Sequence, residues 1–308
     1  MVSRRQFLTR AGGAIVAAEA LSSVGRLHAG PLGMPIGSQV YPHRQRIHDG
    51  DFAGLLRDMK EIGIGQVELD SPAYADSAPL ADGKQTRRIL DDHGIKCPSI
   101  HFTMKELRGD LGPVFEWANQ IGAGQVSTAS LGGKSQDGQT TLEEVKRAAD
   151  EYNRIAAATA KAGLKQTLHD EGFEMAKTED GQVVYRRLID LLDPKLVFFQ
   201  FQISSMRVVG DPVMYFTTWP GRFLSMHLQG VDLNAPMPTP GQRGAGGGAA
   251  AGQTRGGGRG RQLAVGQDSL DWKKIFTAAK TGGLTNYFVE QSWDLTVQSV
   301  TYLKTLNV

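Results

Sequence analysis

The stretch LEEVKRAADEYNRIAAATAKAGLKQTLH, residues 142–169, contains the unit that decides the fold. Its apolar residues recur at helical spacing over 142–162 and predict an amphipathic helix. Gly163 then supplies the residue without Cβ that a left-handed helix C-cap favours. The apolar run over 164–169 is typical of a buried strand. Helix, glycine and strand together predict an α/β unit.

The same rhythm repeats along the chain. A second predicted helix covers residues 51–62, and further glycines close predicted helices at Gly63, Gly94, Gly122 and Gly282. Eight strands are predicted: Ile36 to Tyr41, Gln66 to Leu69, Lys96 to His101, Gln125 to Ser130, Lys165 to His169, Leu196 to Gln202, Phe223 to Gln229 and Asn286 to Glu290. Eight units over this length predict a (β/α)8 TIM barrel, a single domain over 30–308, and an open doubly wound sheet is the alternative.

The first 29 residues are predicted to be a signal peptide. Residues 3–8, SRRQFL, form a twin-arginine pattern, and a mildly apolar stretch leads to a small residue at Ala29. This pattern predicts export by the Tat pathway to the periplasm of a bacterium. The stretch is short and rich in Ala and Gly, so no stable membrane span is expected after export, although an uncleaved anchor is the alternative.

A second segment breaks the α/β rhythm. Residues 234–266 consist mainly of Gly, Ala, Pro and Arg and contain no acid, which predicts a disordered insertion after the seventh strand. Its four arginines could bind an anionic polymer or cover the site, but a tolerated surface expansion is the favoured interpretation. The net charge is +2 for the whole chain, −1 without residues 1–29 and −5 without the insertion arginines as well. A nucleic-acid partner is therefore not expected.

Three residues with metal-binding side chains each end a strand-like run. They are His169, His227 and Glu290. The carboxyl ends of barrel strands open onto one face, so these residues are expected to converge on one site. Two imidazoles and a carboxylate can hold a divalent metal with positions left for substrate. The alternative for any one of them is a hydrogen-bonded structural residue.

Several motifs resemble the xylose-isomerase-like TIM barrels, the sugar phosphate isomerases/epimerases related to endonuclease IV. The resemblance runs from about Gly33 to the C-terminus. Its motifs are Pro220-Gly221-Arg222-Phe223, His227-Leu228-Gln229-Gly230-Val231-Asp232, Gly266 to Phe276, Tyr287 to Gln291, Gly65 to Leu69, Ser99 to His101, and Leu168 to Glu174.

The resemblance implies a divalent metal, most commonly manganese, held by four side chains at the ends of strands five to eight. In this sequence those positions are His169, Gln202, His227 and Glu290. Gln202 stands where the family usually has aspartate, and His169 stands where many members have glutamate. The site is therefore less anionic than the family's, and zinc, cobalt or iron(II) are admissible beside manganese.

Such a metal supports isomerisation, epimerisation or elimination on a sugar. It polarises a carbonyl so that a base can remove the neighbouring C–H proton through an enediolate. With one glutamate replaced by His169, Glu290 or Glu171 remains as the base, which suits elimination. Export favours a non-phosphorylated substrate. The sequence therefore predicts an isomerase, epimerase or lyase acting on a keto-sugar or glycoside, and this group includes a 3-keto-glycoside lyase.

Further polar residues complete the predicted site. Glu68 and His101 end strands two and three and are candidate acid/base or hydroxyl-binding groups, with a structural role as the alternative. Trp293, Lys165 and His43 are candidate substrate-binding residues, although solvent exposure is the favoured interpretation for His43.

Two other functional classes fit the sequence less well. A nuclease would need more metal ligands and a basic cleft, which the negative barrel does not offer. A non-catalytic, exported carbohydrate-binding barrel with a decayed active site is the more serious alternative, because the acidic ligand is missing at Gln202. The sequence leaves the sugar, the metal and the oligomeric state open.

Overall fold

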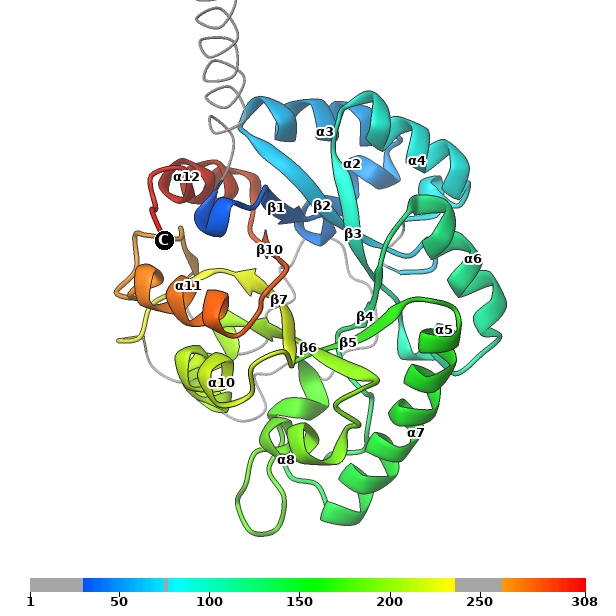
Figure 1. Ribbon diagram of the computed structural model, residues 1–308, viewed down its shortest axis with the longest axis vertical. Helices are drawn as coiled ribbons and strands as arrows, with labels where there is room; N and C mark the ends of the chain where they lie inside the picture. Colours follow the sequence, from blue (N-terminus) through cyan, green and yellow to red (C-terminus); the bar gives the residue numbers. More distant parts are fainter. Residues whose placement is uncertain (1–29, 75–76, 236–261) are drawn as a thin grey trace, which may run out of the picture.

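The computed structural model describes residues 30–74, 77–235 and 262–308. The predicted signal peptide at 1–29 and most of the predicted insertion lie outside these residues. Eight parallel strands close into a barrel in the order β1-β10-β7-β6-β5-β4-β3-β2, and helices surround it (Figure 1). The predicted TIM barrel is confirmed, and the open sheet is excluded.

All eight predicted strands are present. Their bounds are β1 Ile36–Gln39, β2 Ile64–Asp70, β3 Lys96–His101, β4 Gln125–Thr128, β5 Lys165–His169, β6 Val197–Gln202, β7 Phe223–Leu228 and β10 Asn286–Val289. A short antiparallel pair, β8 Gly230–Val231 and β9 Gln262–Leu263, lies just beyond β7. Residues 262–266, predicted to be part of the insertion, therefore belong to the fold, and Ala264 and Val265 are buried.

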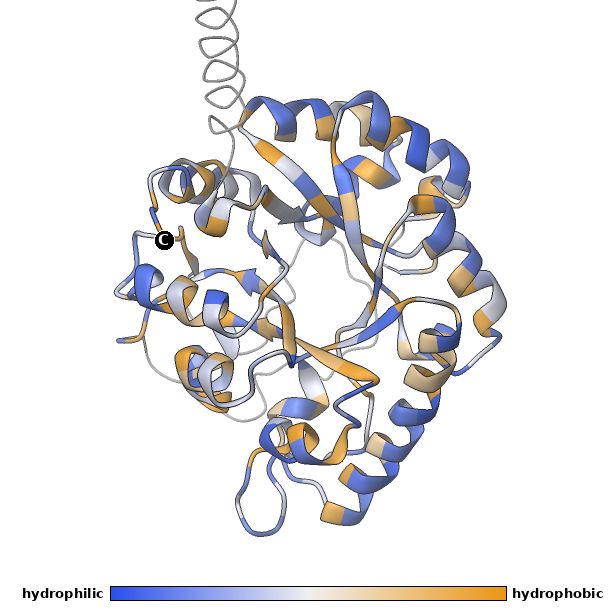
Figure 2. Ribbon diagram, viewed as in Figure 1, coloured by the Kyte–Doolittle hydropathy of each residue, from blue (hydrophilic) through white to orange (hydrophobic). Residues whose placement is uncertain are grey.

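The helices form the outer layer. Their bounds are α2 Arg44–His48, α3 Phe52–Glu61, α4 Gly83–Asp92, α5 Met104–Leu107, α6 Leu111–Ile121, α7 Leu142–Lys161, α8 Val184–Leu191, α9 Met206–Val209, α10 Pro212–Thr218, α11 Trp272–Thr281 and α12 Trp293–Leu303. Hydrophobic residues of the larger helices face the strands and hydrophilic ones face outward (Figure 2). No helix in the described ranges is long and apolar enough to cross a membrane.

Local sequence signals fix where the helices begin and end. The Thr141 hydroxyl accepts a hydrogen bond from the Glu144 amide at the start of α7, a cap that contributes about 1 kcal/mol. Gly63, Gly94, Gly122 and Gly163 have positive φ as expected after helices, but Gly282 has φ −70°. The left-handed residue after α11 is its neighbour Gly283, because Gly282 itself is the helix C-cap.

Alternation along the strands separates two environments. In β2, β3 and β7, apolar residues such as Leu69, Ile100 and Met226 are fully buried and pack in the hydrophobic core. The residues between them, Glu68, His101 and His227, point the other way, into the barrel, because successive strand side chains alternate. The fold thus places polar side chains inside the barrel at the carboxyl ends of its strands.

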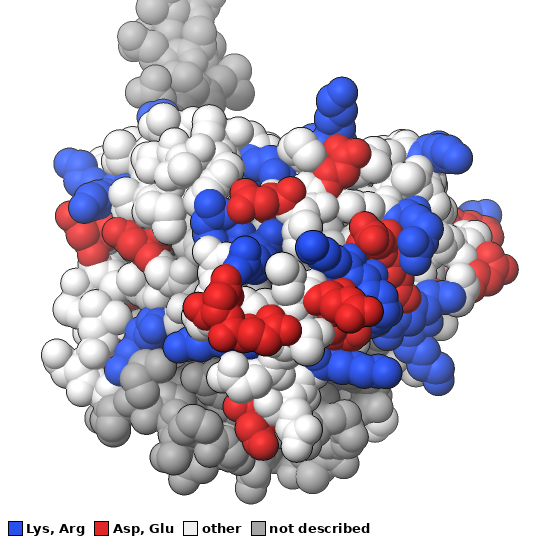
Figure 3. Space-filling view, turned by 90° about the horizontal axis from the view of Figure 1, so that it is seen from below, with Lys and Arg blue, Asp and Glu red and all other residues white. Residues whose placement is uncertain are grey.

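The described surface carries both signs of charge. In the view from below, Lys and Arg side chains alternate with Asp and Glu (Figure 3). Many are paired, such as Arg108 with Glu151 at 2.8 Å and Arg87 with Asp91 at 2.8 Å. Among the described residues in this view, Lys and Arg form no uniform basic patch that would attract a nucleic-acid backbone.

Candidate active site

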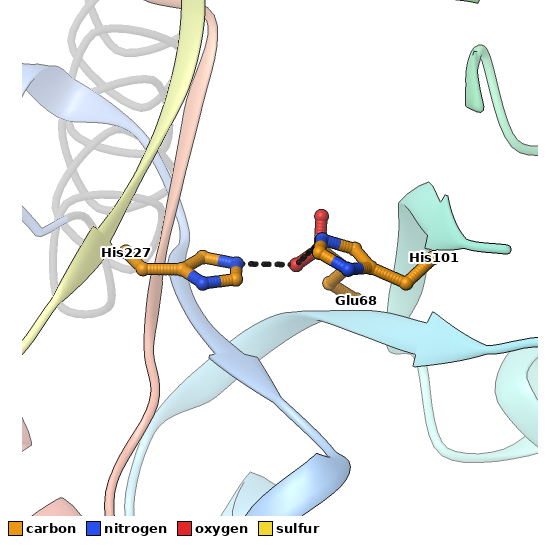
Figure 4. Close-up of side chains that lie close together, drawn as sticks. All are labelled: Glu68, His101 and His227. Atoms are coloured by element: carbon orange, nitrogen blue, oxygen red, sulfur yellow. Dashed lines mark hydrogen bonds and ion pairs between the residues drawn. The ribbon is translucent and has the colours of Figure 1, made fainter. Parts of the chain in front are cut away.

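Glu68, His101 and His227 come from three strands and meet inside the barrel (Figure 4). Their exposed fractions are 0%, 3% and 1%. Glu68 Oε2 lies 2.5 Å from His227 Nε2 and 3.3 Å from His101 Nε2. The three ligand atoms lie within 4.8 Å of one another, so this buried group could hold a metal ion.

A glutamine that the sequence analysis did not single out completes this group. Gln200, on the opposite side of the barrel in β6, donates from Nε2 to Glu68 Oε1 at 2.7 Å. Its Oε1 lies 2.7 Å from His101 Nε2. Both oxygens of the Glu68 carboxylate therefore have hydrogen-bond donors, as a fully buried charge requires.

The second carboxylate, Glu290, lies on the other side of His227. Gln202 and Gln229 donate to Glu290 Oε2 at 2.8 Å and 2.6 Å. His227 Nδ1 is 3.6 Å from the same oxygen, too long for a hydrogen bond. The imidazole of His227 therefore lies between two carboxylates, with Nε2 toward Glu68 and Nδ1 toward Glu290.

A third imidazole joins the cluster. The ring of His169, at the end of β5, lies 4.6 Å from the ring of His227 and 5.6 Å from that of His101, between centroids. The four residues predicted as metal ligands, His169, Gln202, His227 and Glu290, thus lie at the carboxyl ends of four neighbouring strands.

Charge pairing shifts the pKa values of the cluster. Burial opposes ionisation of Glu68, but the charges of His101 and His227 lower its pKa well below the ordinary range. Burial opposes the imidazolium form of His227 as well, yet the charge of Glu68, reinforced by Glu290, raises its pKa to about 10. The metal-free cluster is therefore a carboxylate with a charged imidazole rather than two neutral groups.

The donor atoms beside Glu290 fit a divalent metal. Gln202 Oε1, Gln229 Oε1 and His227 Nδ1 are buried and have no hydrogen-bond partner within the described part of the chain. Amide oxygen, imidazole nitrogen and carboxylate oxygen are ligand types that manganese, zinc, cobalt and iron(II) accept. In contrast, the facing atoms of Glu68, His101 and His227 are already bonded to one another and to Gln200.

His43 is buried, although the sequence favoured solvent exposure. It is only 6% exposed, and its ring meets that of Trp293 edge to face at 5.8 Å. Burial, helped by the charge of Arg46, lowers its pKa to about 4. The expected solvent exposure was wrong because the turn after β1 packs against the start of α12. The candidate substrate-binding pair His43 and Trp293 is brought together.

Two further predicted residues lie at different ends of the barrel. Glu171 is half-buried two residues beyond His169, where its amide donates to the Ala129 carbonyl at 3.1 Å. Lys165 is the exposed first residue of β5, with Nζ 5.7 Å from the centre of the Phe198 ring. The structure does not bring Lys165 to the cluster, because it begins the strand that His169 ends.

Sequence reasoning missed Gln200, Gln229 and Asp70. Asp70 ends β2 and accepts a hydrogen bond from Gln39 at 2.9 Å. A signal for Gln200 was present in the run VFFQFQ of β6, where Gln200 and Gln202 alternate with phenylalanines. In a strand buried on both faces, a repeated polar position marks the side that faces the barrel interior.

Comparison with known proteins identifies the architecture. No protein-family model matches the chain, and no curated protein matches it significantly. Solved structures do match. A sugar phosphate isomerase/epimerase from Parabacteroides distasonis is 17% identical with a TM-score of 0.65, covering 90% of this chain and 94% of that one. The fold is that of the xylose isomerase-like TIM barrels.

Two other solved structures share this barrel fold. The probable 3-DHS dehydratase AsbF of Bacillus anthracis is 13% identical with a TM-score of 0.66, covering 88% of this chain and 98% of that one. A xylose isomerase-like TIM barrel protein from Mycobacterium smegmatis, in complex with magnesium, is 16% identical with a TM-score of 0.60, covering 88% and 95%. At these identities the likeness concerns the fold.

Proposed function

We propose that this protein is a divalent-metal-dependent enzyme that removes a C–H proton beside the carbonyl of a non-phosphorylated keto-sugar or keto-glycoside. The observation that carries the proposal is the position of His227 between Glu68 and Glu290. A metal-binding histidine commonly donates its other ring N–H to a carboxylate, which orients the ring and raises its basicity. Glu68 holds Nε2 in this way and leaves Nδ1 facing Glu290.

The proposed ligands are His169, Gln202, His227 and Glu290. A bound metal supplies polarisation of the substrate carbonyl, which acidifies the adjacent C–H bond. Manganese is the favoured ion, with zinc, cobalt or iron(II) as alternatives. A barrel of the same fold was solved in complex with magnesium, which supports a divalent cation as the ligand. Binding displaces the Nδ1 proton of His227, so metal affinity should rise with pH.

Glu290 is the proposed base. Its side chain is 12% exposed, whereas that of Glu68 is 0% exposed, so a substrate can reach Glu290 alone of the two. The carboxylate takes the proton, the C–H electron pair forms an enediolate, and the neighbouring C–O bond breaks as a C=C bond forms. The leaving oxygen takes the electron pair of that bond and the proton held by Glu290, so it departs as an alcohol and Glu290 returns to the carboxylate form. Glu171 is the second candidate for the base.

Elimination is favoured over isomerisation because a second glutamate is missing at His169. An enzyme that moves a proton between two carbons or two faces needs an acid as well as a base. One carboxylate suffices for elimination, because the proton that it removes from carbon can be returned to the leaving oxygen. The dehydratase of the same fold supports this choice, and the predicted export of the chain fits a substrate without phosphate.

The second candidate function is carbohydrate binding without catalysis. It is favoured by the amides around Glu290, since Gln202 and Gln229 already satisfy its Oε2 without a metal. A protein of this kind would bind the sugar equally well after removal of divalent ions.

Solvent exchange tests the proposed reaction. The full chain, loaded with manganese, is incubated with keto-glycosides in deuterium oxide, and products and recovered substrate are examined by mass spectrometry. We expect release of the aglycone with loss of the C–H proton next to the carbonyl, and neither in Glu290→Gln or His227→Ala. Sugar binding without exchange or release, in protein with or without metal, would contradict the enzyme and favour the binding protein.

A further inference from the structure

We propose that Gln200 is the positioning residue that decides which of two candidate metal sites this barrel uses. The inference rests on the proposed function, and it concerns a residue to which that function assigned no role. The cluster offers two sets of ligands. One is the trio Glu68, His101 and His227, and the other lies around Glu290 on the opposite side of His227.

The direction of the Gln200 amide follows from its neighbours. The Glu68 carboxylate can only accept, so Gln200 must present its NH2 group to Oε1, at 2.7 Å. Its carbonyl oxygen then faces His101 Nε2, also at 2.7 Å. Because two acceptors cannot share a hydrogen bond, His101 Nε2 carries a proton and donates it.

This proton removes the trio as a metal site. A metal needs the lone pair of an imidazole nitrogen, and Nε2 of His101 has none while it donates to Gln200. Nε2 of His227 likewise donates to the Glu68 carboxylate, at 2.5 Å. Two of the three facing ligand atoms of the trio are therefore N–H groups that point at acceptors.

The same hydrogen bonds dedicate Glu68 to His227. Gln200 donates to Oε1 and His227 donates to Oε2, so each oxygen of this fully buried carboxylate has a donor, and His101 Nε2 lies 3.3 Å from Oε2. His227 is thereby fixed as the Nε2–H donor, and only Nδ1, on the Glu290 side, can coordinate. Gln200 thus acts through Glu68 and His101 without touching the metal or the substrate.

Histidine nitrogen NMR of the metal-free protein tests this directly. The full chain is labelled with 15N-histidine, and the His101 signals are assigned by their loss in His101→Gln. We expect His101 Nε2 to carry a proton, and this proton to remain when diamagnetic zinc is added. An unprotonated Nε2, or a zinc-induced shift characteristic of coordination by His101, would overturn the proposal.

A matched pair of variants adds a second readout. Gln200→Met removes both amide bonds at similar volume, and Gln166→Met is the control, because Gln166 is an equally buried strand glutamine bonded to Tyr152 and Thr159. We expect Gln200→Met to weaken zinc binding by about 10- to 100-fold and to lower kcat with little change in KM. Unchanged zinc affinity in Gln200→Met, or an equal loss in Gln166→Met, would contradict the positioning role.

The two proposals fail in different ways. A parent protein that binds no divalent metal refutes the proposed function, yet the protonation of His101 in metal-free protein still decides the hydrogen-bond role of Gln200. If Gln200→Met does not fold, the wild-type NMR measurement alone decides it.

Discussion

Glu68 and Glu290 contact the same imidazole from opposite sides, and their surroundings differ. Glu68 is fully buried, with a donor on each oxygen from Gln200 and His227, and His101 Nε2 lies 3.3 Å away. Glu290 has a partly exposed side chain, two amide donors on one oxygen, and His227 Nδ1 beyond hydrogen-bond length. The first carboxylate is built into the barrel, and the second is presented at its open end.

The difference in burial and bonding suits Glu68 to a structural role and Glu290 to the proposed role in catalysis. A buried carboxylate with a donor on each oxygen stabilises the fold and orients its partners, but it cannot accept a substrate proton without losing those bonds. The two glutamines that donate to Glu290 each have a buried oxygen, Gln202 Oε1 and Gln229 Oε1, that accepts no hydrogen bond from the described residues. Removing each carboxylate should therefore affect different properties.

Glu290→Gln should have the largest effect on turnover. It keeps the shape of the side chain but removes the proposed base and an anionic ligand, so kcat should fall by about 10²- to 10⁴-fold. The free energy of unfolding of the metal-free protein should change by only about 1 kcal/mol. Steady-state kinetics and urea unfolding check this, and Glu171→Gln is the comparison: a larger kcat loss there would transfer the role of base to Glu171.

Glu68→Gln should have the largest effect on stability. It leaves the charged imidazole of His227 buried without its partner, and breaking such a pair typically costs about 3–5 kcal/mol. Urea unfolding of metal-free protein measures the loss. A cost no greater than that of Glu290→Gln would remove the distinction between the two carboxylates.

The stability of the metal-free protein should fall as pH rises from 7 to 10. Folding raises the pKa of His227 from its ordinary value of 6.5 to about 10. The charged imidazole therefore contributes its full stabilisation below pH 6.5, and this contribution is lost as the pH rises through 10. Burial raises the pKa of Asp170 and Glu174 to about 8, so folding keeps them protonated and their contribution declines up to that pH.

Urea unfolding at a series of pH values checks this slope. In Glu174→Gln the free energy of unfolding should fall less steeply with pH up to about 8. Above that pH its slope should be the same as that of the parent. A parent protein whose stability rises between pH 7 and 10 would contradict the charged form of His227.

Lys165→Ala should have the smallest effect. Lys165 begins β5 at the end of the barrel away from His169, and its side chain is exposed. Turnover should stay within about twofold and stability within about 0.5 kcal/mol of the parent. A rise in KM of tenfold or more would restore Lys165 as a substrate-binding residue, and Trp293→Ala, beside His43, is the variant expected to raise KM instead.

The sequence predicted the barrel well because its signals are local. Strands end where apolar runs end, and Gly63 or Gly163 mark helix ends whatever the rest of the chain does. The convergence of His169, His227 and Glu290 followed from topology, since all strand ends of a barrel meet on one face.

The partnerships within the site could not be predicted in the same way. Glu68 and His227 are 159 positions apart, and nothing in either segment indicates that one ring bridges two carboxylates. Gln200 was overlooked because an amide neither titrates nor marks a catalytic group, and because its role depends on two neighbours from other strands. The burial of His43 was missed because it depends on packing against Trp293.

Metal content in one pair of variants tests the central claim most directly. The full chain, His101→Gln and Glu290→Gln are prepared alike, reconstituted with manganese, and measured by elemental analysis after removal of excess ion. The account predicts about one equivalent in the parent and in His101→Gln, and none in Glu290→Gln. Metal lost from His101→Gln but retained by Glu290→Gln would place the site on the Glu68 side and contradict the account.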